Sequence, residues 1–300
     1  MTKNQTTFLD PKTISQAESL GLHARFIVEG YMAGEHKSPF RGFAIEFTQH
    51  REYVPGDDIR HLDWKVLGRT DRYYLKQYEQ ETNYVAHILL DGSESMNYGS
   101  GAITKLHYGK MLSACMAYLV LQQRDAISLG VFDTGMKSYI PRTGNMASIH
   151  NIMAVLAGFQ ADGETNIAAI LHELSGQLKR KGIVILISDF LDNEESMLEG
   201  LQHVRFGGSE VVVFHVMDPF ELTFPFKGMV EFEGLEKIPK IMARPAEIRK
   251  SYLAQLDAFK QRIREGCERN NCHYTLVDTS QPLNEMLSAY LAFRLRTSAR

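Results

Sequence analysis

Residues 182–189 read Gly-Ile-Val-Ile-Leu-Ile-Ser-Asp, and this stretch decides the fold. Five consecutive isoleucine, valine and leucine residues after a glycine predict a strand that is buried on both faces. A second apolar run, Val85–Leu90, ends in the same way at an acidic residue, Asp91. Strands of this kind form parallel sheets covered by helices, so the two runs predict the centre of an α/β fold.

Strand and helix patterns alternate on both sides of these runs. The other predicted strands are Ala126–Phe132, an edge strand at Lys137–Ile140, Val211–Val216 and His273–Val277. The predicted helices are Lys105–Gln123, Ser148–Leu156, Ile167–Leu178, Asn193–Val204, Pro245–Asn270 and a last one that opens at Ser280 and Pro282. This order predicts a doubly wound, mostly parallel, Rossmann-like sheet.

The first eighty residues depart from the alternation. Residues 11–33 have the pattern of an amphipathic helix, and residues 34–72 are rich in Gly, Pro, Arg and Asp, which is typical of turns and small strands. Tyr73–Glu79 alternates like a strand. We predict an N-terminal helix and irregular segment (1–80) packed against an α/β domain (81–300), with an inserted hairpin near 219–243.

The composition limits the function. The 300 residues are 44% hydrophobic and 23% charged, as in soluble globular proteins, and a net charge of −3 argues against nucleic-acid binding. Three cysteines form no disulfide framework and fit a reducing compartment. The N-terminus is polar, and the longest apolar stretch, Met111–Leu121, is about half the length that spans a bilayer. We therefore expect a cytoplasmic protein without direct membrane insertion.

Oxygen-bearing side chains follow the strongest strands. They are Asp91, Ser93 and Ser95 after the first strand, Asp189 after the 183–187 run, and Thr165 just before a helix. In doubly wound sheets these loops open on one edge, where ligands bind. Two carboxylates and three hydroxyls suit a hard cation such as Mg²⁺. With so few carboxylates, the cation would keep the ability to accept a carboxylate from another molecule.

Each of these residues also has a purely structural explanation. Asp-x-Ser-x-Ser before a helix is common in turns and N-caps, because these side chains accept hydrogen bonds from free backbone N–H groups. Thr165 alone is a plausible helix cap, and Asp189 alone is a plausible strand-end acid. Their occurrence together, in order and at strand ends, favours the metal site.

The same five residues resemble the metal-ion-dependent adhesion site of von Willebrand factor A domains, over roughly residues 80–280. The resemblance implies a doubly wound sheet with Mg²⁺ or Mn²⁺ at its edge, and recognition of an acidic group on a partner protein.

A second segment resembles the signature of a bacterial family called "domain of unknown function 58". It comprises Arg41-Gly42, Glu46-Phe47, Arg51–Arg60 and Asp63-Trp64. Members of that family carry the segment ahead of an A-type domain and accompany MoxR-type AAA+ ATPases, so the resemblance implies such an ATPase as a partner. Many members carry transmembrane helices before the segment, where this sequence has the pattern of residues 11–33.

The charged residues of this segment allow two interpretations. One is a salt-bridged turn, with Trp64 packed on the α/β domain, and the other is a docking surface for the ATPase. The residues concerned are Arg41, Arg51, Gly56, Asp57, Asp58, Arg60, Asp63 and Trp64.

The sequence lacks the motifs of common enzymes. It contains no P-loop, no Gly-x-Gly-x-x-Gly after a strand and no Gly-x-Ser-x-Gly elbow. We predict a non-enzymatic, metal-dependent module that binds an acidic residue of a client and works with the ATPase in assembly or maturation. The alternatives are a metal-dependent hydrolase such as a phosphatase, which would want a second Asp in place of Ser93, and an A-type scaffold with an empty site.

Overall fold

The computed structural model describes residue 20 and the ranges 46–54, 64–70, 72–79, 85–178, 181–233 and 240–298. The described residues divide into two compact units. The smaller lies within Phe40–Tyr84, and the larger includes everything from Val85 onward. No helix among the described residues is both long and apolar enough to cross a bilayer.

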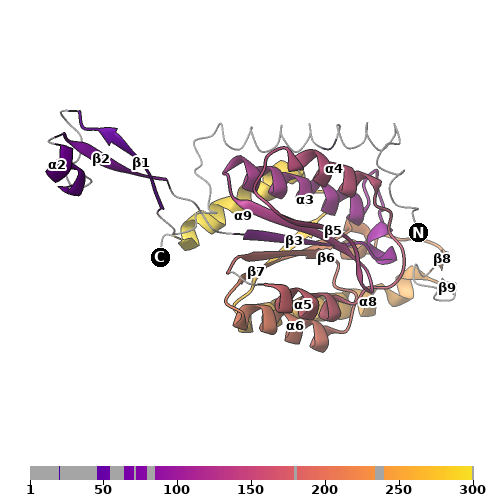
Figure 1. The fold of residues 1–300 in the computed structure, drawn as a ribbon. Coiled ribbons are helices and arrows are strands. Elements are labelled where there is room, and N and C mark those ends of the chain that lie inside the picture. Colours follow the sequence, from indigo (N-terminus) through magenta and orange to yellow (C-terminus); the bar gives the residue numbers. More distant parts are fainter. Residues whose placement is uncertain are drawn as a thin grey trace, which may run out of the picture. The chain divides into compact units, whose positions relative to one another are not determined.

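A six-stranded sheet forms the centre of the larger unit (Figure 1). Its strands lie in the order β10-β7-β6-β3-β4-β5. Their bounds are β3 Val85–Asp91, β4 Ala126–Phe132, β5 Met136–Thr143, β6 Ile183–Ser188, β7 Glu210–Met217 and β10 His273–Asp278. All neighbours pair in parallel except β4 and β5. Numbered within the sheet this is the order 3-2-1-4-5-6, which confirms the predicted doubly wound fold.

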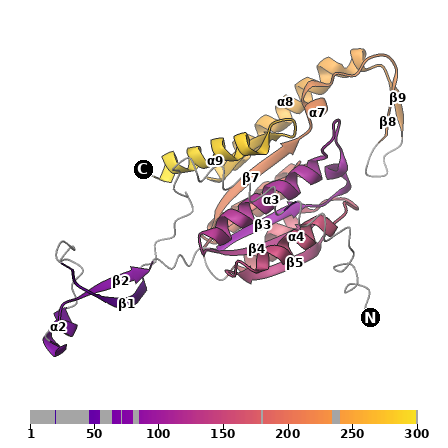
Figure 2. The ribbon, with the colours of Figure 1, turned by 90° about the horizontal axis from the view of Figure 1, so that it is seen from above.

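Helices cover both faces of the sheet (Figures 1 and 2). One face carries α3 Lys105–Gln122, α4 Ser148–Gly158 and α9 Leu283–Ser298, and the other carries α5 Ile167–Gln177, α6 Glu194–Phe206 and α8 Pro245–Arg269. Every residue of β6 is buried, as the apolar run predicts. Each such side chain contributes about 1.5–3 kcal/mol through burial, so the central strands are rigid supports for the loops at their ends.

The edge strand β5 is longer than predicted. It covers Met136–Thr143 and contains Pro141, whereas the sequence pattern predicted only Lys137–Ile140. Proline lacks a backbone N–H, but an edge strand pairs on one side only and tolerates it. The strand therefore continues through a residue that would end a central strand.

A short excursion follows β7. It contains α7 Pro219–Thr223 and two strands, β8 Val230–Phe232 and β9 Ile241–Ala243, which pair antiparallel where the sequence predicts an inserted hairpin. Asp218 caps α7 through the backbone N–H of Phe220, and the Glu221 carboxylate accepts from the N–H of Asp218. We call residues 218–243 the insertion.

The described part of the smaller unit contains two antiparallel strands and one helix. Strand β1 (Glu46–Glu52) pairs with β2 (Tyr74–Glu79), and α2 (Trp64–Thr70) lies between them in sequence. The strand predicted at 73–79 is β2. The prediction of turns and small strands at 34–72 missed α2, because seven residues are too few to show a helical period. The predicted helix at 11–33 lies outside the described residues except for Leu20, which is helical and buried.

Candidate functional site

Strands β3 and β6 are neighbours at the point where the sheet order reverses. The helices that follow them, α3 and α6, lie on opposite faces of the sheet, so the two loops lead away from each other (Figure 1). Asp91 ends β3, and Ser188 and Asp189 lie at the end of β6. Doubly wound proteins bind ligands at this position.

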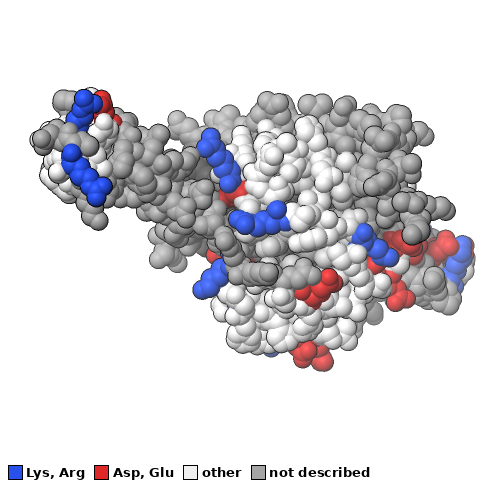
Figure 3. Space-filling view, in the orientation of Figure 1, with Lys and Arg blue, Asp and Glu red and all other residues white. Residues whose placement is uncertain are grey.

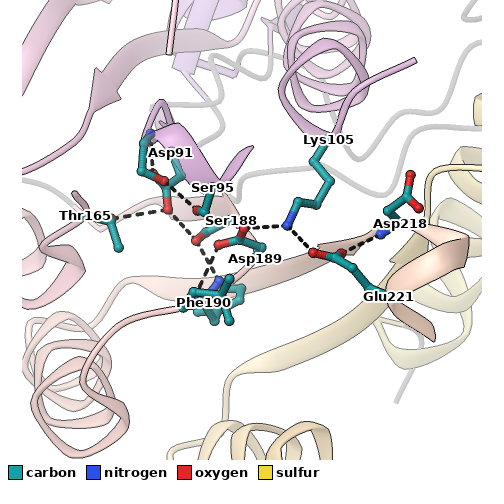
Figure 4. A network of polar contacts seen from close by, with 11 residues as sticks. Asp91, Ser95, Lys105, Thr165, Ser188, Asp189, Phe190, Asp218 and Glu221 are labelled. Carbon is teal, nitrogen blue, oxygen red and sulfur yellow. Dashed lines mark hydrogen bonds and ion pairs between the residues drawn. The ribbon is translucent and has the colours of Figure 1, made fainter. Parts of the chain in front are cut away.

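The Asp91 carboxylate is the centre of the site (Figure 4). Its Oδ1 accepts a hydrogen bond from the backbone N–H of Ser93 at 3.0 Å. Its Oδ2 accepts from the Thr165 hydroxyl at 3.2 Å and the Ser188 hydroxyl at 2.5 Å. The hydroxyls of Ser93 and Ser95 lie 3.1 Å apart. The structure thus brings the predicted residues together from three loops.

The capping interpretation fails for Ser93 and Thr165. Ser93 occupies the N-cap position of a 3₁₀ turn, but its side chain makes no capping hydrogen bond. The cap of α5 is Asn166, which accepts from the N–H of Ala169, and not Thr165. Both hydroxyls are therefore directed at the site.

Backbone hydrogen bonds fix the loop after β3 against the end of β4 and the loop before α5. Gly92 N–H donates to the Phe132 carbonyl at 2.6 Å, and Glu94 N–H donates to the Gly163 carbonyl at 2.8 Å. Gly92 is required here, because a side chain at this position would overlap the ring of Phe159. The loop conformation is set before any ligand arrives.

Burial leaves the negative charge of the Asp91 carboxylate only partly compensated. Asp91 is fully buried and Asp189 is 2% exposed. Burial raises the pKa of Asp91 to about 7, the negative charge of Asp189 adds to the rise, and hydrogen bonds from Ser188 and Ser93 offset only part of it. A cation beside Asp91 would remove this penalty.

Lys105 is a site residue that the sequence reasoning missed. It is 1% exposed, and its Nζ lies 2.7 Å from Asp189 Oδ2 and 2.7 Å from Glu221 Oε1 (Figure 4). Burial alone would lower the pKa of Lys105, but attraction to Asp189 and Glu221 outweighs it and raises the pKa. The insertion is thereby linked to the centre of the sheet.

One signal in the sequence could have identified Lys105. It is the first residue of α3, where the helix dipole disfavours a positive charge. Such a residue needs a compensating anion, and here there are two. Burial raises the pKa of Glu221 despite Lys105, so we regard the Lys105–Asp189 pair as the stronger contact.

Phe190 holds the loop after β6 in an unusual conformation. Its φ is 59°, in the left-handed region that a bulky residue seldom adopts, and its side chain is fully buried. Its ring packs edge-on against His215 with 5.2 Å between ring centroids. This packing anchors the turn between Asp189, which faces Lys105, and Leu191, which is 49% exposed.

The donor set contains few carboxylates. Among the described residues no group of three or more His, Cys, Asp and Glu side chains could hold a metal. The site residues are instead two aspartates and several hydroxyls, which is the set predicted from the sequence.

Little of the predicted docking segment is described. Arg51 lies in β1, and Trp64 begins α2 and is 67% exposed. The remaining predicted residues lie outside the described ranges: Arg41, Gly56, Asp57, Asp58, Arg60 and Asp63. The choice between a salt-bridged turn and a docking surface stays open.

Comparison with known proteins gives relatives of similar length. "Uncharacterized protein Rv1480" of Mycobacterium tuberculosis and "Uncharacterized protein Mb1516" of Mycobacterium bovis are each 24% identical over 76% of this chain and 72% of the relative. Among solved structures, an aerotolerance-related membrane protein from Bacteroides fragilis is 18% identical, with a TM-score of 0.49 over 71% of this chain and 99% of that one. The SpRpn10 VWA domain is 12% identical, with a TM-score of 0.40 over 68% of this chain and 93% of that one.

The family comparison covers most of the chain. Residues 49–262 match the model of one family, and this range includes the last part of β1, the predicted docking segment from Arg51 onward, and the loops of the site. The chain belongs to the family described as "Protein of unknown function DUF58".

Proposed function

We propose that this chain is a divalent-metal-dependent protein-binding module. Mg²⁺ or Mn²⁺ would be held by Asp91, Ser93, Ser95, Thr165 and Asp189, and would accept an acidic side chain of a client protein. The observation that carries the proposal is the pair of buried carboxylates at the switch point of the sheet, surrounded by hydroxyls from three loops.

The residues present fit such a cation. Mg²⁺ and Mn²⁺ prefer oxygen ligands, and carboxylate and hydroxyl oxygens are the groups gathered here. Burial raises the pKa of Asp91, and the charge of Asp189 adds to the rise, which supports the need for added positive charge. When bound, the metal would supply an electrophilic position for an outside carboxylate. Because Lys105 already pairs with Asp189, part of the negative charge is offset, and this favours a cation that keeps its affinity for an external anion.

The family resemblance supports a proposal for the partner. We propose that the module works in the cytoplasm with a MoxR-type AAA+ ATPase, during assembly or maturation of the client. Binding of the client's carboxylate to the metal would require no catalytic group in this chain.

Calorimetric titration with Mn²⁺ tests the metal site directly. Asp91→Ala should abolish binding, because it removes the central carboxylate. Asp278→Ala is the matched control, since Asp278 also ends a parallel strand, β10, but bonds with Ser280 instead of the site. Equal Mn²⁺ affinity in wild type and Asp91→Ala would refute the metal site.

A pull-down from cell extract tests the partner. Wild type in Mg²⁺ should retain an AAA+ ATPase or a client that is lost with EDTA and in Asp91→Ala, but kept in Asp278→Ala. Metal-dependent hydrolysis of p-nitrophenyl phosphate, abolished in Asp91→Ala, would instead support the phosphatase alternative.

A further inference from the structure

The insertion forms one side of an apolar pocket beside the metal site. The pocket has a volume of about 410 Å³, within the range of small ligand sites. Seven of the lining side chains are apolar or aromatic. They are Tyr98, Leu191, Phe220, Phe224, Phe226, Phe232 and Tyr252.

The aromatic rings support one another. Phe224 packs on Tyr252 with centroids 4.4 Å apart, and Phe226 lies 5.1 Å from Phe224 and 5.4 Å from Phe232. Phe224 is 5% exposed and has a φ of 46°, so this cluster maintains a strained backbone. The pocket wall is therefore largely formed before a ligand binds.

The open side of the pocket leaves apolar surface in water. Phe220 is 37% exposed and Leu191 is 49% exposed. Exposed apolar groups that line a concave surface mark a binding site more often than scattered ones do.

The pocket and the metal site share residues. Ser95 and Lys105 line the pocket, while Ser95 belongs to the predicted metal ligands and Lys105 pairs with Asp189. Leu191 lies two residues after Asp189. One short segment of a partner can therefore reach both places.

The charges at the pocket favour an uncharged occupant. Acidic side chains gather at the β8–β9 end of the larger unit (Figure 3), and two glutamates line the pocket. Each already has a lysine: Glu221 lies 2.7 Å from Lys105, and Glu233 lies 3.2 Å from Lys240. A cationic ligand would have to compete with these pairs, and an anionic ligand would meet the carboxylates. An apolar side chain neither competes with these ion pairs nor is repelled by the carboxylates.

We infer that this pocket receives an aromatic or branched aliphatic side chain of the client, close in sequence to the acidic residue that the metal binds. The inference rests on the proposed function for the carboxylate, but the apolar pocket itself needs no bound metal to receive a side chain. The client motif is thus an acidic residue with a Phe, Leu or Ile neighbour.

Saturation-transfer NMR on the full chain tests the pocket. The probes are N-acetyl-phenylalaninamide and N-acetyl-lysinamide without metal, and acetylated, amidated tripeptides with Asp beside Phe, Leu, Lys or Gly, in Mg²⁺ and in EDTA. We expect phenylalaninamide to bind without metal, and Asp–Phe or Asp–Leu tripeptides to bind in Mg²⁺ at least fivefold tighter than Asp–Gly or Asp–Lys.

Variants of the pocket separate recognition of the apolar side chain from metal binding. Phe226→Ala in the insertion and Leu191→Ala in the loop after β6 should each remove the preference for Phe, with the fold checked by circular dichroism. Phe206→Ala, an exposed phenylalanine (79%) at the end of α6, is the control and should keep it.

The outcomes distinguish this inference from the proposed function. The pocket inference is wrong if phenylalaninamide does not bind, if lysinamide binds better, or if both wall variants bind like wild type. Suppose instead that the tripeptides bind equally in Mg²⁺ and in EDTA, while phenylalaninamide still binds and Phe226→Ala weakens its binding. That result would refute the metal site and support the pocket.

Discussion

Lys105→Met removes the buried ammonium while keeping most of the side-chain volume. Lys105 and Asp189 are 1% and 2% exposed, so the Asp189 carboxylate would stay buried without its counter-charge. Breaking such a pair costs about 3–5 kcal/mol. Glu221 would lose the same ammonium, but it is 19% exposed and water would compensate part of that loss. We therefore expect a cost at the lower end of this range, about 3 kcal/mol. For a unit of this size that corresponds to a fall in Tm of roughly 6–12 °C.

Urea unfolding followed by circular dichroism in EDTA measures this loss without any metal contribution. Lys240→Met is the matched control, because Lys240 also lies between two carboxylates, Glu231 at 3.6 Å and Glu233 at 3.2 Å, but is 56% exposed. Lys240→Met should lower the free energy of unfolding by less than about 1 kcal/mol. Adding Asp189→Asn to Lys105→Met should recover stability, since the uncompensated charge is then gone. A Lys105→Met variant as stable as Lys240→Met would refute the reasoning.

Three further predictions concern other positions. Asp125 is 3% exposed and burial raises its pKa to about 7, so between pH 4 and 7 the folded state holds more protons than the unfolded state and stability falls as pH rises. Asp125→Asn should therefore raise stability by about 1–2 kcal/mol at pH 8 and leave it unchanged at pH 4, measured by thermal melts at both. Thr165→Val removes a hydroxyl bonded to Asp91 and should weaken Mn²⁺ binding about tenfold in calorimetry, a loss of about 1.4 kcal/mol; unchanged affinity would exclude Thr165 as a ligand. Gly182→Ala places a methyl group against the Val85 carbonyl and should cost about 1–3 kcal/mol in urea unfolding, whereas Gly176→Ala, which has open space around it, should not destabilise.

The sequence was sufficient for the sheet because its central strands carry their own signal. Ile183–Ile187 is apolar at every position, and only a strand buried on both faces needs that pattern. The short helices α2 and α7 span seven and five residues, too few for a helical period to show. The extent of β5 depends on its place at the edge of the sheet, which becomes known only with the topology.

The residues of the site likewise differ in whether the sequence alone predicts them. Asp91, Ser93, Ser95, Thr165 and Asp189 were predictable because loops at the ends of parallel strands meet at one edge. Lys105 was missed although it begins α3, because its partners Asp189 and Glu221 are 84 and 116 positions away in sequence. Lysine is almost never fully buried, so a sequence pattern places it in solvent unless its partners are already known. The aromatic pocket was missed for a related reason, since its lining comes from the insertion, α8, the start of α3 and the loops after β3 and β6.

The lysine that joins Asp189 to Glu221 makes the two halves of this surface thermodynamically dependent on each other. Any cation bound at Asp189 changes the field at Lys105, and therefore the strength of its contact with the insertion. Binding free energies are reciprocal: if occupancy of the insertion alters metal affinity by some factor, metal alters the affinity of that occupant by the same factor. A client could then be bound tightly while the cation is present. It would be released when a partner acts on either the metal site or the insertion, with no movement of the central sheet.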